Sequence, residues 1–123
     1  MITRYLLATS QYAATAGRVK AAAFLPSAAR LPASISVFEI DGLAEPAIWA
    51  LGKAEVAIPR DKPLYARADL ESGAVTRAEL RLVQTPPPRH ANLLGWPSDR
   101  SDQQLVAMRL SQEAQLVLNP TGT

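Results

Sequence analysis

The sequence predicts an α+β domain: a small, mostly antiparallel or mixed sheet with a short central helix and a C-terminal helix packed on one face. Two observations predict this class. Strand-like segments outnumber helical ones over residues 1–83, and the strongest helix signal comes last. With 123 residues, 48% hydrophobic and 20% charged, the chain has the length and composition of one globular domain. We therefore expect a single domain over residues 1–123 that ends in a flexible tail, 119–123.

The N-terminal third begins with a strand signal. Residues 2–8 combine a β-branched pair with large apolar side chains and predict a short first strand. Residues 11–25 leave two alternatives open, because the alanines favour helix whereas residues 19–25 also suit a strand. Residues 26–32 begin and end with proline and predict a loop.

The strongest strand signal and the first helix signal follow. Residues 34–40 carry apolar side chains on both faces, which predicts a central strand, and Asp41-Gly42 has turn chemistry that ends it. A helix of about two turns comes next. Pro46 suits its first turn, and Gly52 is expected to end it in the left-handed conformation.

The middle of the chain alternates between strands and turns. We expect residues 55–58 to pair briefly before a turn at 59–63. Residues 64–70 alternate cleanly between apolar and polar side chains, as a half-buried strand does. A turn at 71–73 then leads to residues 75–83, which suit either a strand or a short helix.

The last element predicted is a helix over residues 102–118. Ser101 is a suitable N-cap, Gln104 completes a capping box, and Asp102 places negative charge in the first turn. Asn119-Pro120 ends the helix. An apolar stripe at helical spacing is expected to cover the sheet: Leu105, Val106, Met108, Leu110, Ala114 and Val117.

Composition excludes several classes of protein. The chain has no cysteine, which excludes disulfides, thiolate metal sites and cysteine nucleophiles and fits a cytoplasmic protein. No uninterrupted apolar run is long enough for a transmembrane helix, so we expect a soluble chain without a membrane partner. Residues 1–38 hold four basic residues and no acid, a composition shared by organellar transit peptides. Because residues 2–8 look like a strand, we interpret this region as a basic edge of the domain.

The segment 86–97 concentrates the chemically useful side chains. It holds the only histidine, His90, with Arg89 before it, Asn92 two residues later and Trp96 in a Gly-Trp-Pro turn. An imidazole titrates near neutral pH and can accept and return a proton, which makes His90 the candidate catalytic residue. Arg89 could hold an anion, and Asn92 would share a face with His90 in an extended segment. Residues 86–88, three prolines, predict a stiff extended spacer.

A second group of candidates lies outside that segment. Arg67 shares the outward face of strand 64–70 with Asp69, either as an anion clamp or, as we interpret it, as a surface ion pair of little energetic weight. Trp49 is expected to pack in the core, whereas Trp96 suits the core and a stacking platform equally. The acidic residues do not cluster near His90 in sequence, so we expect neither a metal site nor a cofactor.

Nucleic-acid binding is not predicted. The net charge is only +2, and the aromatics among the N-terminal basic residues match no RNA-binding signature. The chain also lacks a phosphate-binding glycine loop and a Gly-x-Ser-x-Gly nucleophile motif.

Two functions follow from these residues. The first is a small non-enzymatic binding or regulatory module whose segment 86–97 binds a protein partner or a small anionic ligand, with Arg67, Arg89, His90, Asn92 and Trp96 as ligand-binding residues. The alternative is a small hydrolase or transferase that acts on a phosphate- or nucleotide-containing substrate, with His90 as acid and base. Either one is compatible with a homo-oligomer.

Overall fold

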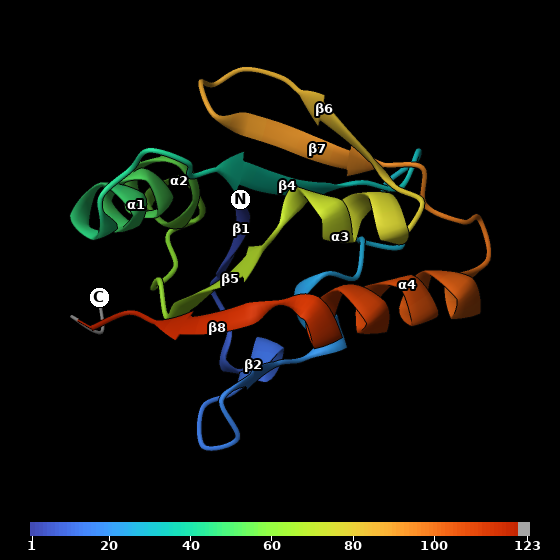
Figure 1. Cartoon of the computed structure of the whole chain (residues 1–123), viewed down its shortest axis with the longest axis horizontal. Helices are drawn as coiled ribbons and strands as arrows, with labels where there is room; N and C mark the ends of the chain where they lie inside the picture. Colours follow the sequence, from blue (N-terminus) through green and yellow to red (C-terminus); the bar gives the residue numbers. More distant parts are fainter. Residues whose placement is uncertain (121–123) are drawn as a thin grey trace.

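The computed structural model describes residues 1–120 and has the predicted α+β class, with a six-stranded sheet and helices on both of its faces (Figure 1). The strand order is β6-β7-β4-β1-β5-β8, and every pairing in this sheet is antiparallel. Its strands are β1 (Ile2–Leu6), β4 (Ile35–Glu39), β5 (Ala66–Leu70), β6 (Arg81–Gln84), β7 (His90–Leu94) and β8 (Gln115–Leu118). The pair β2 (Tyr12–Ala13) and β3 (Arg18–Val19) forms a separate small hairpin.

The helices divide between the two faces of the sheet. They are α1 (Glu45–Gly52), the π-helical turn η3 (Lys53–Ala57), α2 (Ile58–Arg60), α3 (Ser72–Arg77) and α4 (Arg100–Glu113), with single 3₁₀ turns η1 (Thr9–Gln11) and η2 (Ala21–Ala23). In Figure 1, α1 and α2 lie to the left of the sheet and α3 and α4 to its right. No helix within residues 1–120 is long and apolar enough to cross a membrane.

Each face of the sheet has its own core. On the face that α4 covers, Leu6 and Val37 pack with Phe24 and with Leu110 of α4. On the face that α1 covers, Tyr5 and Phe38 pack with Ile48 and other residues of the helical segment. Neighbouring residues of one strand, such as Tyr5 and Leu6, therefore serve different cores, because side chains alternate across a strand.

The predicted strands at 2–8, 34–40 and 64–70 are confirmed as β1, β4 and β5. As predicted, β4 is central, since it pairs with β1 on one side and β7 on the other. Pairing on both edges and packing on both faces explain why its sequence carries apolar side chains on both faces.

Residues 11–25 form neither the helix nor the strand that the sequence left open. Tyr12 pairs with Val19 in the β2–β3 hairpin, and Gly17 takes a positive φ of 65° in the turn between them. The 3₁₀ turn η2 follows and brings Phe24 fully into the core. The run of alanines does not form a regular helix, because the glycine permits a tight turn that buries Val19 and Phe24 instead.

The first helix does not end at Gly52, contrary to the sequence prediction. Gly52 is helical with φ −63°, and the chain continues through η3 and α2 to Asp61, which takes the left-handed conformation with φ 51°. The brief strand expected at 55–58 is therefore wrong. Gly52 serves close packing instead, because a Cβ at this position would lie 2.3 Å from Cε1 of Tyr5. Tyr5 also donates a hydrogen bond of 2.6 Å to the carbonyl of Ile48.

The turn expected at 71–73 is the beginning of α3, which buries Ala74 and Val75. The strand β6 follows, so residues 75–83 contain both of the predicted alternatives in succession. A short helix satisfies the backbone hydrogen-bonding groups as a turn would, and it also adds apolar contacts over the sheet.

The C-terminal helix is present but shorter than predicted, and its N-cap is Asp99 rather than Ser101. An Asp99 carboxylate oxygen accepts the backbone N–H of Asp102 at 3.2 Å. The helix ends at Glu113, and Gln115–Leu118 form β8, which pairs with the edge of β5. Backbone hydrogen bonds to that open edge outweigh the helical preference of residues 115–118.

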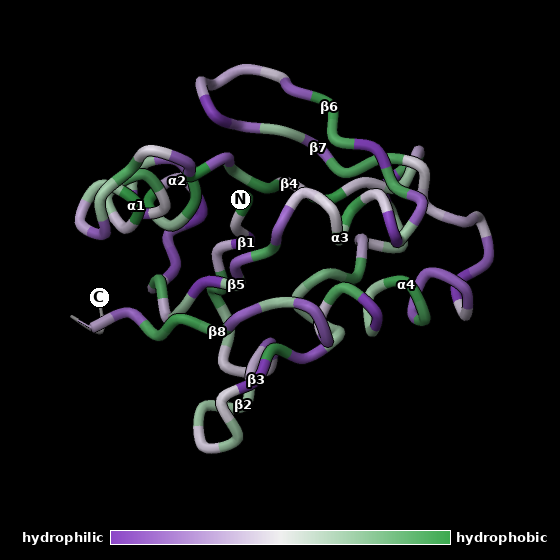
Figure 2. The backbone as a smooth tube through the Cα atoms, in the orientation of Figure 1, coloured by the Kyte–Doolittle hydropathy of each residue, from purple (hydrophilic) through white to green (hydrophobic). Residues whose placement is uncertain are grey.

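The buried face of α4 is also shifted from the predicted stripe. Leu105 and Met108 are 60% and 43% exposed, whereas Ala107 and Leu110 are fully buried. Figure 2 shows hydrophobic and hydrophilic residues alternating along α4, as expected of a helix with one buried side. At the start of the expected flexible tail, the side-chain amide of Asn119 donates to the carbonyl of Leu64 at 2.8 Å. Residues 121–123 of that tail lie outside the described residues.

Candidate functional site

Residues 86–89 form the loop of the hairpin that joins β6 to β7. The backbone N–H of Thr85 donates to the carbonyl of His90 at 3.1 Å, and the N–H of His90 donates to the carbonyl of Pro87 at 3.0 Å. The three prolines are therefore part of a tight turn and not the extended spacer that the sequence predicted. Arg89 completes the turn with a positive φ of 71°.

The imidazole of His90 is held from two sides. Its Nδ1 lies 2.7 Å from the hydroxyl of Thr85, across the base of the hairpin. Its ring meets that of Phe38, its partner on β4, edge to face at a centroid distance of 5.2 Å. No residue within 1–120 hydrogen-bonds to Nε2 of His90. The ring thus has a defined orientation and one nitrogen that remains available.

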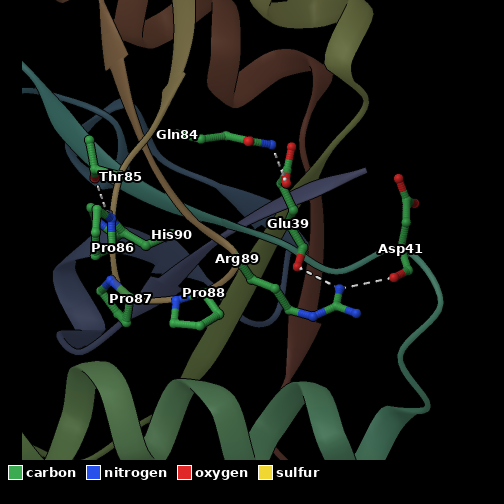
Figure 3. Close-up of a pocket in the computed structure, with 9 residues that line it drawn as sticks. All are labelled: Glu39, Asp41, Gln84, Thr85, Pro86, Pro87, Pro88, Arg89 and His90. Atoms are coloured by element: carbon green, nitrogen blue, oxygen red, sulfur yellow. Dashed lines mark hydrogen bonds between the residues drawn. The ribbon is translucent and has the colours of Figure 1, made fainter.

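One side of the hairpin forms an open pocket of about 790 Å³, here called the hairpin pocket (Figure 3). Figure 3 shows Arg89 reaching from the loop to the carbonyls of Glu39 and Asp41, at 3.2 and 3.0 Å. The Glu39 carboxylate accepts from the Gln84 amide at 2.9 Å, and the Asp41 carboxylate binds the N-terminal ammonium at 3.1 Å. The polar groups of this pocket are bonded to other protein groups, and its two carboxylates disfavour an anion there.

The other side of the hairpin faces α2 and η3 across a smaller pocket of about 140 Å³, the inner pocket. His90 and Phe38 line this pocket together with Val56. Its polar lining includes Ser36 and Arg60. Glu55 and Pro87 complete the wall. His90 lines both the hairpin pocket and the inner pocket.

The structure does not bring Asn92 and Trp96 together. Asn92 follows His90 by two residues on β7, as expected for the same face, and pairs in register with Ser36 of β4. Its side-chain oxygen is buried, and no partner for it exists within residues 1–120. Trp96 packs against the core beneath α4 and donates from its indole nitrogen to the carbonyl of Leu93 at 3.0 Å. The tryptophan thus contributes to the opposite face of the sheet.

Arg67 is not a surface residue, contrary to the interpretation from sequence. Its side chain is 4% exposed and lies on β5, which β1 and β4 separate from β7. It donates to both carboxylate oxygens of Glu45, at 3.1 and 2.8 Å, and to Asp69 at 3.0 Å. The structure therefore does not bring Arg67 to His90, and its guanidinium is already paired.

These contacts alter the titration of the groups involved. Burial opposes the charge on Arg67, but its hydrogen bonds to Glu45 and Asp69 outweigh that effect and raise its pKa. The same hydrogen bond lowers the pKa of Glu45. Trp49 stacks on the guanidinium of Arg67, with a distance of 4.8 Å from Cζ to the ring centroid. The Trp49 side chain is partly buried and packs against the edge of the core.

The residues that sequence reasoning missed are those that reach His90 from other elements. Phe38, Arg60 and Ser36 precede it by 30 to 54 positions in the chain, and no local pattern links them to the hairpin. Residues 1–120 contain no group of three or more acidic or histidine side chains that could hold a metal ion. Comparisons with protein-family models, with curated proteins and with solved structures found no match to this chain.

Proposed function

We propose that the chain is a small non-enzymatic binding module that holds a small anionic ligand at the β6–β7 hairpin, in the inner pocket beside His90. The observation that carries this proposal is the position of the His90 ring. Thr85 and Phe38 fix its orientation, and no residue in the described range 1–120 hydrogen-bonds to its Nε2. A fixed ring with one available nitrogen can donate to or accept from a ligand at little entropic cost.

The lining of the inner pocket supports a ligand site. Phe38 and Val56 supply apolar walls, and Ser36 and Arg60 supply a few polar groups among them. Small-molecule sites commonly combine mostly apolar walls with a small number of polar groups that fix orientation. Glu55 adds a carboxylate to this lining, so the preference for an anion must come partly from positive charges outside the inner pocket.

The surroundings of His90 favour binding over catalysis. A general acid or base is usually oriented by a carboxylate or a second titratable group, and the hydrogen-bond partner of His90 is the Thr85 hydroxyl. In the alternative function, a hydrolase or transferase acting on a phosphate- or nucleotide-containing substrate, Arg67 or Arg89 would hold the anion of the substrate. Arg67 is remote and paired, and Arg89 donates to backbone carbonyls on the far side of the hairpin.

Because His90 is the only histidine, its ring resonances identify it directly in NMR spectra. We expect a saturable shift of its ring signals when adenosine monophosphate is added at constant pH. His90→Gln is expected to weaken the binding of adenosine monophosphate by about tenfold, measured by calorimetry. Gln84→Ala alters the hairpin pocket alone and serves as the matched control, with unchanged affinity expected.

Two results would contradict the proposal. The first is the absence of a saturable shift with adenosine monophosphate, phenyl phosphate and citrate at millimolar concentrations. The second is release of inorganic phosphate from adenosine monophosphate or phenyl phosphate by the wild-type chain but not by the His90→Gln variant. That release would establish the enzymatic alternative.

A further inference from the structure

A third pocket, here called the arginine pocket, lies where β1 and β4 separate. These strands pair in register only at Ile2 with Glu39 and at Thr3 with Phe38, and beyond this point Arg4 fills the gap between them. Arg4 donates from Nη1 to the carbonyl of Ser36 at 2.8 Å and from Nε to the carbonyl of Ala23 at 3.1 Å. The pocket at this gap measures about 140 Å³.

The polar lining of the arginine pocket is entirely cationic or hydroxylic. It consists of Arg4, Arg30, Arg60, Ser27, Ser34 and Ser36. No acidic residue lines it, and no ion pair within residues 1–120 involves any of the three arginines. Three like charges thus surround one small pocket without a protein counter-charge, an arrangement that an anion would stabilise.

The electrostatics of Arg4 agree with this picture. Burial, followed by the positive charges of Arg60 and Arg30, lowers the pKa of Arg4 to about 10. Its hydrogen bonds to the protein involve Nε and Nη1, which leaves Nη2 available. The side chains of Arg30 and Arg60 are exposed and make no hydrogen bond with any residue in the described part of the chain. All three guanidinium groups can therefore donate to an oxyanion.

The arginine pocket adjoins the inner pocket, because Ser36 and Arg60 line both of them. We propose that the arginine pocket binds the phosphate group of a phosphate-ester ligand whose organic part lies in the inner pocket against Phe38 and His90. This inference rests on the proposed function for the organic part of the ligand, and on the arginine pocket itself for the phosphate.

Two arguments favour a phosphate over a carboxylate. A phosphate presents oxygens in a tetrahedral arrangement, which three guanidinium groups and neighbouring serine hydroxyls can satisfy at the same time, whereas a planar carboxylate has only two oxygens. Pockets for whole drug-sized ligands measure roughly 300–1,000 Å³. The arginine pocket and the adjoining inner pocket measure about 140 Å³ each, so each suits one group of a small ligand.

The test uses inorganic phosphate and adenosine monophosphate as separate probes, with binding measured by calorimetry on the full chain. We expect Arg30→Gln and Arg60→Gln each to weaken the binding of both probes by about tenfold, as loss of a hydrogen bond to a charged group implies. Both arginines are exposed, so these variants are expected to fold. Arg109→Gln, an exposed arginine on α4, is the matched control and is expected to bind as the wild type does. His90→Gln is expected to weaken the binding of adenosine monophosphate only.

Each outcome separates this inference from the proposed function. If the wild type does not bind inorganic phosphate at millimolar concentrations, or if Arg30→Gln and Arg60→Gln bind both probes as the wild type does, the arginine pocket is not a phosphate site. If adenosine monophosphate binding depends on His90 but not on the arginines, the proposed function stands and this inference fails. If phosphate binding depends on the arginines while His90 has no effect on either probe, the reverse holds.

Discussion

The buried Arg67 network allows a quantitative prediction about stability. The two carboxylates that pair with Arg67 differ in their surroundings, because the Glu45 side chain is 61% exposed whereas that of Asp69 is 11% exposed. Water screens the ion pair between Arg67 and Glu45, whereas it screens the pair between Arg67 and Asp69 only weakly. Removing Arg67 would therefore leave one nearly buried carboxylate without its counter-charge.

Arg67→Met should be strongly destabilising for this reason. Breaking a buried ion pair by removing one partner costs about 3–5 kcal/mol, and loss of the stacking on Trp49 adds about 0.5–1 kcal/mol. Domains are stable by only about 5–15 kcal/mol in total. At this chain length, the loss corresponds to a fall in the melting midpoint on the order of 10–20 °C.

Urea unfolding followed by circular dichroism measures the effect, with two matched variants beside it. Glu45→Gln breaks only the solvent-screened pair and is expected to cost about 1 kcal/mol or less. The double variant Arg67→Met/Asp69→Leu replaces both buried charges by apolar groups and is expected to recover most of the lost stability. If Arg67→Met were no more destabilising than Glu45→Gln, the argument from burial would be refuted.

Four further predictions follow from the fold. Gly52→Ala should lower the melting midpoint, because the new Cβ would lie 2.3 Å from the Tyr5 ring. Overpacking of this kind costs about 1–3 kcal/mol, and an unchanged midpoint would contradict the close approach. The Glu45 pKa lies below its ordinary value of 4.5, so the stability that Glu45 contributes is present above pH 4.5 and is lost as the pH falls through the folded-state pKa. In Glu45→Gln, the melting midpoint should therefore fall less steeply with pH on the acid side. Truncation after Trp96 removes α4 and β8 and is expected to give an unfolded or insoluble product. A cooperative thermal transition in that product would disprove their structural role. His90→Ala should shift the midpoint by only a few degrees because the ring is half-buried, and a loss of more than about ten degrees would make it a core residue.

The strands with a regular side-chain pattern could be predicted from the sequence. Residues 64–70 alternate between apolar and polar side chains, and residues 34–40 carry apolar side chains on both faces; both segments form the predicted strands, β5 and β4. The expectation that residues 64–70 are only half-buried is wrong, because Glu45 and Trp49 of α1 cover Arg67 on the other face. These patterns, with a helix signal near the C-terminus, were enough for the α+β class. The hairpin segment 86–97 was also recognisable, because its prolines and His90 are adjacent in the chain.

Tertiary contacts decided the rest. Residues 115–118 have a helical pattern but form β8, since the open edge of β5 offers backbone partners that a longer helix could not use. The helix that begins at Glu45 continues past Gly52, and Tyr5 packs against that glycine. Whether Arg67 is exposed depends on α1, which comes from elsewhere in the chain and supplies Glu45.

The candidate site shows the same division. His90 could be singled out from sequence, but its ring contact with Phe38 exists only because β4 and β7 pair in the sheet. The three arginines of the arginine pocket lie at positions 4, 30 and 60, so no local spacing connects them. They meet because β1 and β4 diverge beneath the end of α2, and the fold alone determines which distant charges share one pocket.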